Sequence, residues 1–317
     1  MLSTLEIVLI SIASFILILI ILFLLIGFFF FKGTFSRIDL NKYHKKEQKG
    51  LDDTVKLLID EEFINNHHFE EIFIKSNDNL KLAANFLKAK NKSHKYVIFF
   101  HGYRGSVLLE WSSLIHLFYD RGYNIYSIHE RANHDSEGKY FTMGPKEKDD
   151  LVCWVNYLSS FDKDSKICLF GHSMGGHIVL LGLGEKLKDN VKCAISDCGY
   201  ASLKDEIIFT GKNLVHLKST KFLVSIGELY IKIFHKMSLK ETTMDSLKKA
   251  TIPICLIHGS GDKFVPFYNL DLNYNAIKEG TYKEKHVFIG AAHCSSESLD
   301  SKRYHKIVLD FVDKFID

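Results

Sequence analysis

The chain has 317 residues, of which 46% are hydrophobic and 13% aromatic, enough for a substantial buried core. Its 41 basic and 38 acidic side chains leave a formal net charge of only +3, and so weak a charge does not predict a nucleic-acid partner. The six cysteines are scattered, without the close pairs of a zinc site or a disulfide framework. We interpret them as small buried hydrophobic residues.

An apolar segment dominates the start of the chain. Between Glu6 and Lys32 every residue is uncharged, and nearly all are Ile, Leu, Phe or Val. The segment exceeds the roughly 20 residues that a helix needs to cross the hydrocarbon of a bilayer. A cleavable signal peptide has a basic start, a shorter apolar stretch and a small-residue cleavage site. We therefore expect a transmembrane helix over residues 7–31, with a buried core helix as the alternative.

The charges around this segment predict its orientation. The α-amino group and Glu6 precede it, whereas a run of basic residues follows it: Lys32, Arg37, Lys42, Lys45, Lys46 and Lys49. Basic residues favour the cytoplasmic side of a membrane, so we expect the rest of the chain in the cytoplasm, with the extracellular face as the alternative. Residues 32–68 are expected to form a juxtamembrane connector, with a short helix over Val55–Phe63.

From residue 69 to residue 317, extended and helical patterns alternate. Several of the extended runs, such as Val97–Phe100 and Ile167–Phe170, are apolar throughout, which is typical of strands covered on both faces. The order of elements predicts an α/β domain with a mostly parallel, eight-stranded, doubly wound sheet that begins antiparallel. Strands are expected at residues 71–75, 82–87, 96–100, 124–129, 166–170, 191–196, 252–258 and 285–289.

A long stretch interrupts this alternation. Residues 201–249 are helical and amphipathic in pattern and separate two predicted strands. We expect a helical cap insertion. Its apolar residues are more numerous than the packing of one helix needs, which leaves two interpretations open: they line an apolar substrate pocket, or they pack onto the sheet. The residues concerned are Phe209, Leu214, Phe222, Leu223, Leu229, Tyr230, Ile233 and Phe234.

The strongest chemical motif is Gly171-His172-Ser173-Met174-Gly175. It follows an apolar strand and begins a predicted helix, so its glycines permit a sharp turn that exposes the Ser173 hydroxyl. The helix N-terminus beneath such a serine favours developing negative charge. The pattern therefore predicts Ser173 as a nucleophile.

A serine hydroxyl is a weak nucleophile unless a histidine accepts its proton and an acid orients that histidine. Asp262 lies in a turn just after an apolar strand, and His293 lies in the loop between the last strand and the last helix. Both loops are expected at the carboxyl edge of the sheet, as is Ser173. We predict a triad of Ser173, Asp262 and His293. His67, His68, His235 and His286 are expected to be surface or packing residues.

An oxyanion in this chemistry needs backbone donors that are already in place. One is normally the N–H of the residue after the nucleophile, here Met174, and the other comes from the loop after an earlier strand. His101-Gly102-Tyr103-Arg104-Gly105 is such a turn, and we predict the Tyr103 N–H as the second donor. Arg104 is interpreted as a solvated loop residue, with contact to a polar substrate group as the alternative.

Together these motifs resemble the α/β-hydrolase superfamily, and in particular its serine aminopeptidase-like and acyl-esterase-like bacterial members. The resemblance covers residues 69–317 and implies the α/β-hydrolase fold and a serine hydrolase. Residues 131–138 resemble the family's Arg-x-His-Gly-x-Ser-x-Gly loop, but Asn133 and His134 stand where His and Gly are expected. Some members carry the triad acid where Asp197 stands here. We favour Asp262 and interpret Asp197 as a structural acid at the start of the insertion.

The expected reaction is acyl transfer through an acyl-Ser173 intermediate, with no metal and no organic cofactor. An ester or thioester near the membrane suits the apolar anchor and insertion. The alternative is a peptidase acting on short N-terminal peptides, which needs an acidic group for the substrate amine: Glu130, Glu137 and Asp197 are candidates. A catalytically idle, membrane-anchored binding module is a third and less favoured interpretation, since all triad members are present. Protein partners are not predicted.

Overall fold

The computed structural model describes residues 3–37, 57–105 and 108–316. Four of the basic residues that favoured a cytoplasmic orientation, Lys42, Lys45, Lys46 and Lys49, lie outside the described residues, as does most of the predicted connector. The strands are β1 (Glu70–Lys75), β2 (Lys81–Leu87), β3 (Lys95–Phe100), β4 (Asn124–His129), β5 (Lys166–His172), β6 (Val191–Asp197), β7 (Ile254–Gly259) and β8 (Lys283–Phe288).

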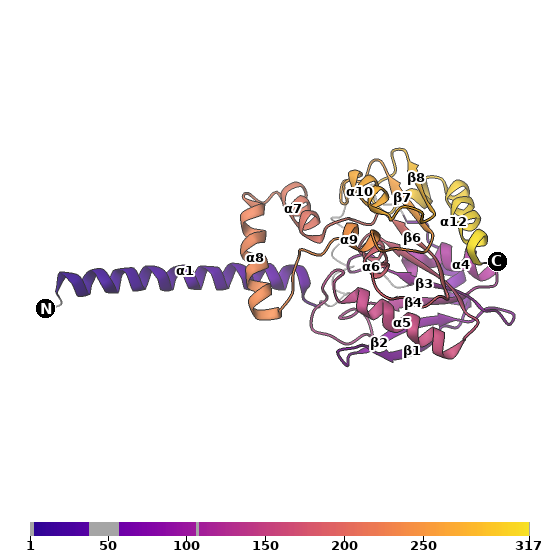
Figure 1. Ribbon diagram of the computed structural model, residues 1–317, viewed down its shortest axis with the longest axis horizontal. Helices are drawn as coiled ribbons and strands as arrows, with labels where there is room; N and C mark the ends of the chain where they lie inside the picture. The colour runs from indigo at the N-terminus through magenta and orange to yellow at the C-terminus, as the bar shows by residue number, and fades with distance from the viewer. Residues whose placement is uncertain (1–2, 38–56, 106–107, 317) are drawn as a thin grey trace. The chain divides into compact units, whose positions relative to one another are not determined.

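The helices alternate with these strands (Figure 1). They are α1 (Thr4–Phe35), α3 (Glu61–Asn66), α4 (Ser112–Asp120), α5 (Glu147–Phe161), α6 (Met174–Gly182), α7 (Leu203–Asn213), α8 (Thr220–His235), α9 (Thr243–Leu247), α10 (Tyr268–Ala276), α11 (Ser296–Leu299) and α12 (Ser301–Ile316). A 3-10 turn, η1 (Leu109–Trp111), leads into α4.

The strands form one sheet with the order β1-β2-β4-β3-β5-β6-β7-β8. β1 and β2 pair antiparallel, as do β2 and β4, and all pairings from β4 through β3 to β8 are parallel. The predicted mostly parallel, eight-stranded sheet with an antiparallel start is therefore confirmed. Because parallel strands end at the same edge, the loops after β3, β5, β6, β7 and β8 share one rim.

Helices cover both faces of the sheet, which explains the apolar runs in its central strands. On one face α4 and α12 pack their aromatic and aliphatic residues, such as Phe118 and Tyr304, against Phe99 and Phe170. On the other face α5, α6, α9 and α10 contact one another in series, and α6 is buried along its whole length. β5, the strand that leads into Ser173, is thus packed by helices on both of its faces.

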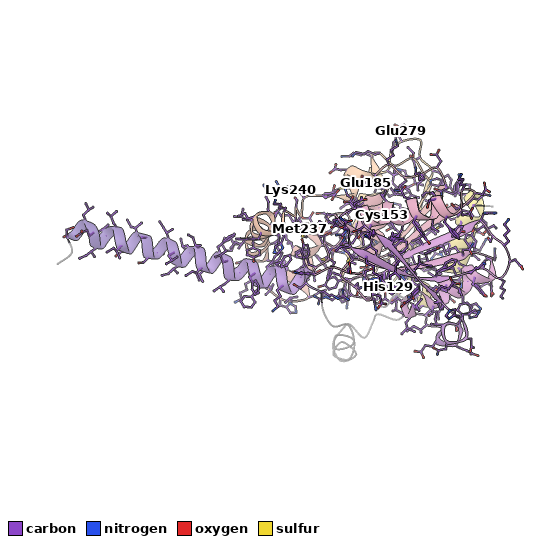
Figure 2. All side chains as sticks on the ribbon, turned by 90° about the horizontal axis from the view of Figure 1, so that it is seen from below. His129, Cys153, Glu185, Met237, Lys240 and Glu279 are labelled. Carbon is purple, nitrogen blue, oxygen red and sulfur yellow. The ribbon has the colours of Figure 1, made fainter. Side chains whose placement is uncertain are left out.

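The described chain divides into two compact units. One contains residues 37–203 and 241–317, with the whole sheet, and we call it the sheet unit. The other contains residues 1–36 and 204–240, so that α1 packs with the helices of the insertion. α1 is a 32-residue helix whose residues are exposed over most of its length, and Figure 2 shows its side chains projecting from the helix. By length and composition it is a candidate membrane span.

Some element boundaries differ from those that the sequence predicts. The seventh strand begins at Ile254 and not at Ile252, since Pro253 has no N–H to donate and only its carbonyl joins the sheet, accepting from Ala194 N. The helix after Ser173 ends at Gly182, just before Gly184 lies against Ser246.

The short helix predicted at Val55–Phe63 is α3, which starts later, at Glu61, and ends at Asn66. The Asp60 side chain caps it by accepting from the Phe63 N–H (3.0 Å), so the helix begins where a capping residue is available. Val55 and Lys56 are outside the described residues.

Candidate active site

Ser173 occupies the turn between β5 and α6. Its backbone has φ 51° and ψ −115°, a positive-φ conformation that is costly for a residue with a side chain. The Ser173 N–H donates to the Asp197 carbonyl (2.8 Å), which ties the turn to the end of β6. This sharp strand-to-helix turn is the geometry that presents a nucleophile at the edge of a sheet.

Three glycines make this turn possible. A Cβ at Gly171 would lie 2.2 Å from the Gly175 backbone, one at Gly175 would lie 1.8 Å from the Phe100 carbonyl oxygen, and one at Gly176 would lie 2.6 Å from Ser196 Oγ. Two of these neighbours are backbone atoms, which have no way to move aside. The glycines of the motif are therefore required by close backbone approach as well as by the turn itself.

The structure brings Ser173, His293 and Asp262 into one chain of hydrogen bonds. His293 Nε2 lies 2.9 Å from Ser173 Oγ, and His293 Nδ1 lies 2.7 Å from Asp262 Oδ2. The three residues come from the loops after β5, β8 and β7, on the rim where the sequence placed them. The arrangement allows His293 to accept the hydroxyl proton while its other nitrogen donates to the carboxylate.

Asp262 is held ionised by its surroundings. Its other oxygen, Oδ1, accepts from the N–H groups of Phe264 and Val265, both at 2.9 Å, and Oδ2 also lies 3.2 Å from His258 Nε2. Burial acts to raise the pKa of Asp262, but the charge of His293 and the hydrogen bonds from His258 and His293 outweigh it and leave that pKa well below its ordinary value.

The same contact acts in the opposite direction on His293. Burial acts to lower the pKa of His293, whereas its interactions with Cys198 and with the Asp262 carboxylate raise that pKa well above the ordinary value. A base whose protonated form is favoured in this way is well suited to hold the proton that it takes from Ser173.

Asp197 ends β6 and is fully buried, but it makes different contacts. Its Oδ2 accepts a hydrogen bond from the Tyr304 hydroxyl of α12 (2.8 Å) and lies 3.5 Å from His172 Nε2. The side chain thus bonds to the last helix, whereas the sequence pattern favoured a role in securing the start of the insertion. Burial raises the pKa of Asp197 to about 7, with the Tyr304 hydrogen bond opposing the change.

The two predicted oxyanion donors belong to segments that meet at Ser173. Met174 is the first residue of α6, directly after the nucleophile. Gly102 of the β3 turn approaches so closely that a Cβ there would lie 3.7 Å from Ser173 Cβ, and Tyr103 is the next residue. A hollow lined by Met174, Phe141 and others opens beside them. Tyr103 covers Phe141 edge to face, with ring centroids 5.4 Å apart.

Arg104, which was expected to be a solvated loop residue, also lines this hollow. Its guanidinium lies over the Tyr103 ring, 4.7 Å from the centroid. The residue therefore borders the same hollow as Met174, and contact with a polar substrate group stays a prediction.

The residues that depart from the family loop pattern contact the oxyanion turn. Asn133 Nδ2 lies 2.9 Å from His101 Nε2, and His134 Nε2 lies 3.1 Å from the Gly105 carbonyl. Because the turn runs from His101 to Gly105, the two contacts fasten it at both ends. The sequence did not predict this role of Asn133 and His134. Their departure from the family loop pattern was the one signal that could have indicated it.

Behind this turn lies a buried polar pair, His101 and Glu130. His101 Nδ1–H donates to the Gly102 carbonyl (2.7 Å), and its Nε2 lies 3.1 Å from Glu130 Oε2. Burial lowers the pKa of His101 to about 3, with the Gly102 bond opposing, and burial raises the pKa of Glu130 well above its ordinary value. Burial therefore disfavours the charged form of each group, and the pair lies directly behind the oxyanion turn.

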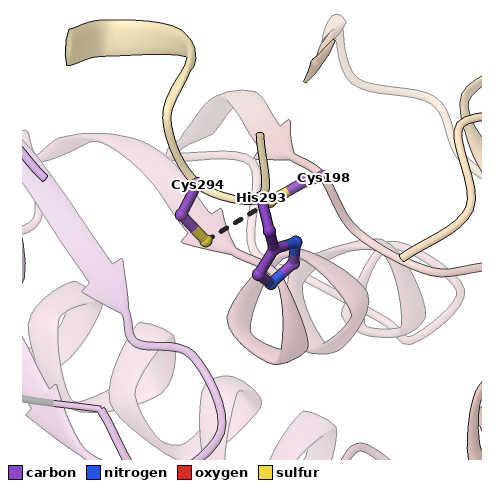
Figure 3. A group of neighbouring side chains, drawn as sticks. All are labelled: Cys198, His293 and Cys294. Carbon is purple, nitrogen blue, oxygen red and sulfur yellow. Dashed lines mark hydrogen bonds between the residues drawn. The ribbon is translucent and has the colours of Figure 1, made fainter. Parts of the chain in front are cut away.

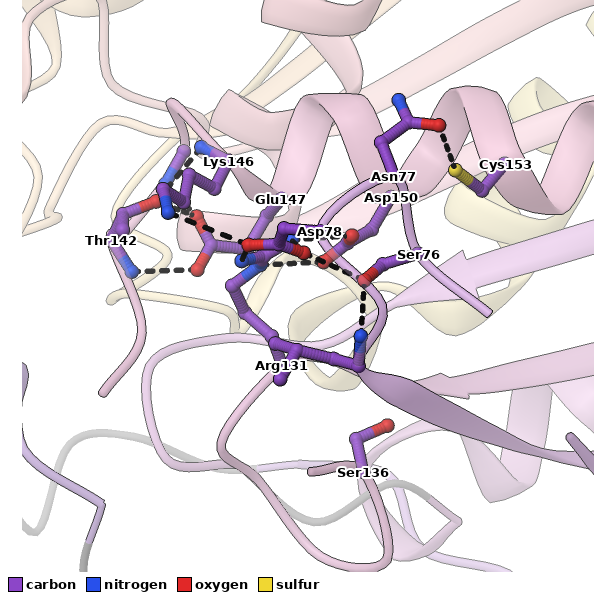
Figure 4. A network of polar contacts seen from close by, with 12 residues as sticks. Ser76, Asn77, Asp78, Arg131, Ser136, Thr142, Lys146, Glu147, Asp150 and Cys153 are labelled. Carbon is purple, nitrogen blue, oxygen red and sulfur yellow. Dashed lines mark hydrogen bonds and ion pairs between the residues drawn. The ribbon is translucent and has the colours of Figure 1, made fainter. Parts of the chain in front are cut away.

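Arg131 anchors the base of the same loop (Figure 4). It is 4% exposed and binds Asp150 through two hydrogen bonds, from Nε (2.7 Å) and Nη2 (2.6 Å). Asp78 accepts two more from its Nη1 and Nη2, at 2.9 and 3.2 Å. Two bidentate contacts to one guanidinium fix its plane, which is a reason for arginine and not lysine here.

Two cysteines lie beside the candidate base (Figure 3). Cys198 Sγ and Cys294 Sγ are 3.5 Å apart, and with His293 they form a group whose ligand atoms all lie within 4.8 Å of one another. Both nitrogens of His293 already contact Asp262 and Ser173. A metal bound to this group would have to displace one of those contacts, so the cluster does not fit a metal that assists the triad. All six cysteines are free.

The chain is similar to known proteins over most of its length. Residues 110–317 match the prolyl oligopeptidase family, Peptidase_S9. An uncharacterized protein of Bacillus subtilis (strain 168), YqkD, is 26% identical over 223 residues, which cover 70% of this chain and 72% of that protein.

Solved structures share the fold. The Pyrococcus furiosus esterase Pf2001 has a TM-score of 0.66 at 24% identity, covering 83% of this chain and 99% of that one. The Pyrococcus horikoshii acylaminoacyl peptidase has a TM-score of 0.62 at 19% identity, covering 88% of this chain and 44% of that one. These likenesses confirm the α/β-hydrolase fold. Because the family match spans well over half of the chain and includes the loops that carry Ser173, Asp262 and His293, the protein belongs to the prolyl oligopeptidase family and is a serine hydrolase.

Proposed function

We propose that the protein hydrolyses a carboxylic ester or thioester through an acyl-Ser173 intermediate. The observation that carries the proposal is the continuous hydrogen-bond chain from Ser173 Oγ through His293 to Asp262. We assign Ser173 as the nucleophile, His293 as the base and then the acid, and Asp262 as the group that orients His293.

In the first half-reaction Ser173 Oγ attacks the substrate carbonyl carbon while His293 Nε2 takes the hydroxyl proton. The oxygen that becomes negative is held by the backbone N–H groups of Met174 and Tyr103. His293 then gives its proton to the leaving oxygen or sulfur, and the bond between it and the carbonyl carbon breaks. In the second half-reaction a water adds to the acyl-Ser173 carbonyl by the same steps and releases the acid. No residue in this sequence of steps calls for a metal or an organic cofactor.

The peptidase alternative is supported by the family match and by the acylaminoacyl peptidase among the similar structures. An aminopeptidase needs a carboxylate for the substrate amine. The three candidates have other contacts: Glu130 lies against His101, Glu137 accepts from Lys81 N (2.9 Å), and Asp197 accepts from Tyr304. Because all three carboxyl groups already have partners within the protein, an ester is favoured as the substrate. The esterase among the similar structures agrees with this choice.

We also propose that α1 anchors the enzyme in a membrane, with residues 32–68 as a connector, residues 69–317 as the hydrolase domain and its catalytic side in the cytoplasm. The length and apolar composition of α1 support the anchor. Lys32 in the last turn of α1 and Arg37 after the helix favour the cytoplasmic side. Protease treatment of intact and lysed cells tests the orientation: protection in intact cells is expected, and digestion there contradicts it.

Labelling with a fluorophosphonate probe tests the chemistry. The intact protein should label and Ser173→Ala should not, whereas a catalytically idle binding module would leave the intact protein unlabelled. A panel of acyl esters, thioesters and aminoacyl amides then separates the esterase from the peptidase. Faster turnover of amides than of matched esters would overturn the ester assignment.

A further inference from the structure

The insertion helix α8 presents an apolar face to solvent. Phe222, Leu229 and Ile233 are 64%, 50% and 54% exposed, and their spacing of seven and four residues places them on one side of the helix. We call these three side chains the α8 face. The sequence left open whether they line a substrate pocket or pack onto the sheet; within the unit that holds α1 and α8 they are exposed to solvent.

A different side of α8 is fixed to α1. A Cβ at Gly27 would lie 2.3 Å from the Tyr230 ring, and a Cβ at Gly227 would lie 2.2 Å from the Phe30 ring. Each helix therefore offers a glycine to an aromatic ring of the other. His235 also stacks on a ring of α1, that of Phe31, with centroids 3.6 Å apart. Reciprocal contacts of this kind leave little freedom for α8 to rotate about its axis and hide the α8 face.

α8 runs across α1 and not along it, as Figure 1 shows within this unit. If α1 crosses a membrane, a helix that runs across it lies in the plane of that membrane. The contact between α1 and α8 then also lies at a defined depth in the membrane. A helix of 32 residues is about 48 Å long, whereas the hydrocarbon core is about 30 Å thick. Counted from residue 7, where the predicted span begins, about 30 Å of helix ends near Gly27, so α8 meets α1 close to the head-group boundary.

Basic residues flank the α8 face. Lys218 and Lys221 lie at the start of α8, and Lys232 and Lys236 lie at its end, and all four are exposed. An apolar stripe bordered by lysines on a helix that lies in the membrane plane is the pattern of an interfacial helix, with the lysines available to anionic head groups.

We propose that the α8 face rests in the head-group region of the bilayer that α1 spans, so that the insertion is a second membrane contact. The proposal rests on the proposed anchoring by α1. The consequence for function is that the insertion brings the hydrolase to lipid-dissolved substrates.

Brominated lipids test the position of the α8 face. The full chain is reconstituted into vesicles of phosphatidylcholine and phosphatidylglycerol in which the acyl chains carry bromine either near the glycerol end or near the methyl end. Phe222→Trp and Leu229→Trp each place a fluorophore on the α8 face, and the signal of the two native tryptophans is subtracted by use of the unmodified chain. Lys302→Trp, at an exposed position of α12, is the solvent control, and Leu17→Trp reports on α1.

We expect bromine near the glycerol end to quench the introduced fluorophores at positions 222 and 229 by about half, because an interfacial helix lies roughly 5–10 Å into the head-group boundary. Bromine near the methyl end should quench the fluorophore at position 17 more strongly and should leave the one at position 302 unchanged. An unchanged thermal unfolding midpoint shows that each variant is folded.

Three results overturn the proposal in different ways. Quenching at position 17 without quenching at 222 and 229 shows an anchor whose insertion faces water. An absence of quenching at positions 17, 222 and 229 alike contradicts the proposed membrane anchor itself. A blue-shifted emission at 222 that disappears when the protein-to-lipid ratio is lowered shows that a second copy of the chain, and not lipid, covers the α8 face.

Discussion

Two aspartates end up buried at the same rim of the sheet, and they differ in the contacts that surround them. Asp262 is reached by two backbone N–H groups and by two histidines, and the charges and hydrogen bonds of the histidines lower its pKa. Asp197 is reached by one hydroxyl, and burial raises its pKa to about 7. Since both follow a buried strand, position alone does not distinguish a triad acid. The contact with His293 Nδ1, which Asp262 makes, is the observation behind the proposed assignment.

Asp262→Asn should produce the largest change. The amide keeps the shape of the side chain but favours the wrong tautomer of His293 and gives no stabilisation to its protonated form, so we expect kcat on an ester to fall about 10⁴-fold. Asp197→Asn is the matched control, because it makes the same substitution at the neighbouring strand end. If loss of activity follows Asp197→Asn and not Asp262→Asn, the assignment of the acid is wrong.

The pH dependence of labelling tests the same contact through His293. Only neutral His293 accepts the Ser173 proton, so the rate falls as the pH decreases through the pKa of His293. Because that pKa is raised, the midpoint for the intact enzyme should lie above the ordinary histidine value. Removal of an adjacent opposite charge shifts a pKa by about 1–3 units, so Asp262→Asn should move the midpoint down by about that amount.

Labelling rates with a fluorophosphonate probe, measured from acid to alkaline pH in both proteins, give this comparison even if the variant turns over slowly. Equal midpoints in the two proteins would mean that the Asp262 carboxylate does not control the protonation of His293. Asp197→Asn again serves as the control, and its midpoint should stay close to that of the intact enzyme.

A smaller effect is expected where the oxyanion turn is fastened. Asn133→Ala removes the contact to His101 but leaves both backbone donors in the chain, so we expect kcat to fall about tenfold, less than the roughly 10²-fold loss of an oxyanion donor itself. KM should change little, because the turn is needed chiefly in the transition state. Asn133→Asp, which keeps an acceptor without the amide donor, should not restore the rate, whereas Asn133→Gln should restore part of it.

The sequence predicts those parts of the site that local pattern determines. Ser173 is evident from its glycines and its place between strand and helix, and Asp262 and His293 follow from chain order. Other contacts join residues that are far apart in the chain, and no periodicity reports them: Asn133 meets His101 and Asp197 meets Tyr304, at separations of 32 and 107 positions.

The contacts of Gly27 in α1 and Gly227 in α8 were equally hidden from sequence analysis. Gly27 is one of two glycines in α1 and Gly227 is the one glycine of α8, and only the packing of α1 on α8 shows that each receives an aromatic ring. Local pattern reports which face of a helix is apolar, but it does not report which other helix covers that face.

Asp197→Asn should have the smallest effect on activity. Its effect on the pH dependence of stability should show the clearest difference between the two aspartates. A carboxyl whose pKa is raised in the folded state contributes its full stability below the pKa of the unfolded chain. That contribution is lost as the pH rises through the folded value, here about 7. The intact protein should therefore lose stability between about pH 4 and pH 7, because the carboxyl ionises in the unfolded chain at this pH while the buried carboxyl stays protonated.

The amide introduced by Asp197→Asn has no proton to lose and still offers an oxygen to the Tyr304 hydroxyl, so the variant should lack that part of the decline while kcat changes less than about threefold. Thermal unfolding midpoints of the full chain in detergent, measured at several pH values from about 4 to about 8, make the comparison. Parallel curves for the intact protein and the variant would show that Asp197 is ionised across this range. In that case the contrast with Asp262 would lie in geometry alone and not in charge.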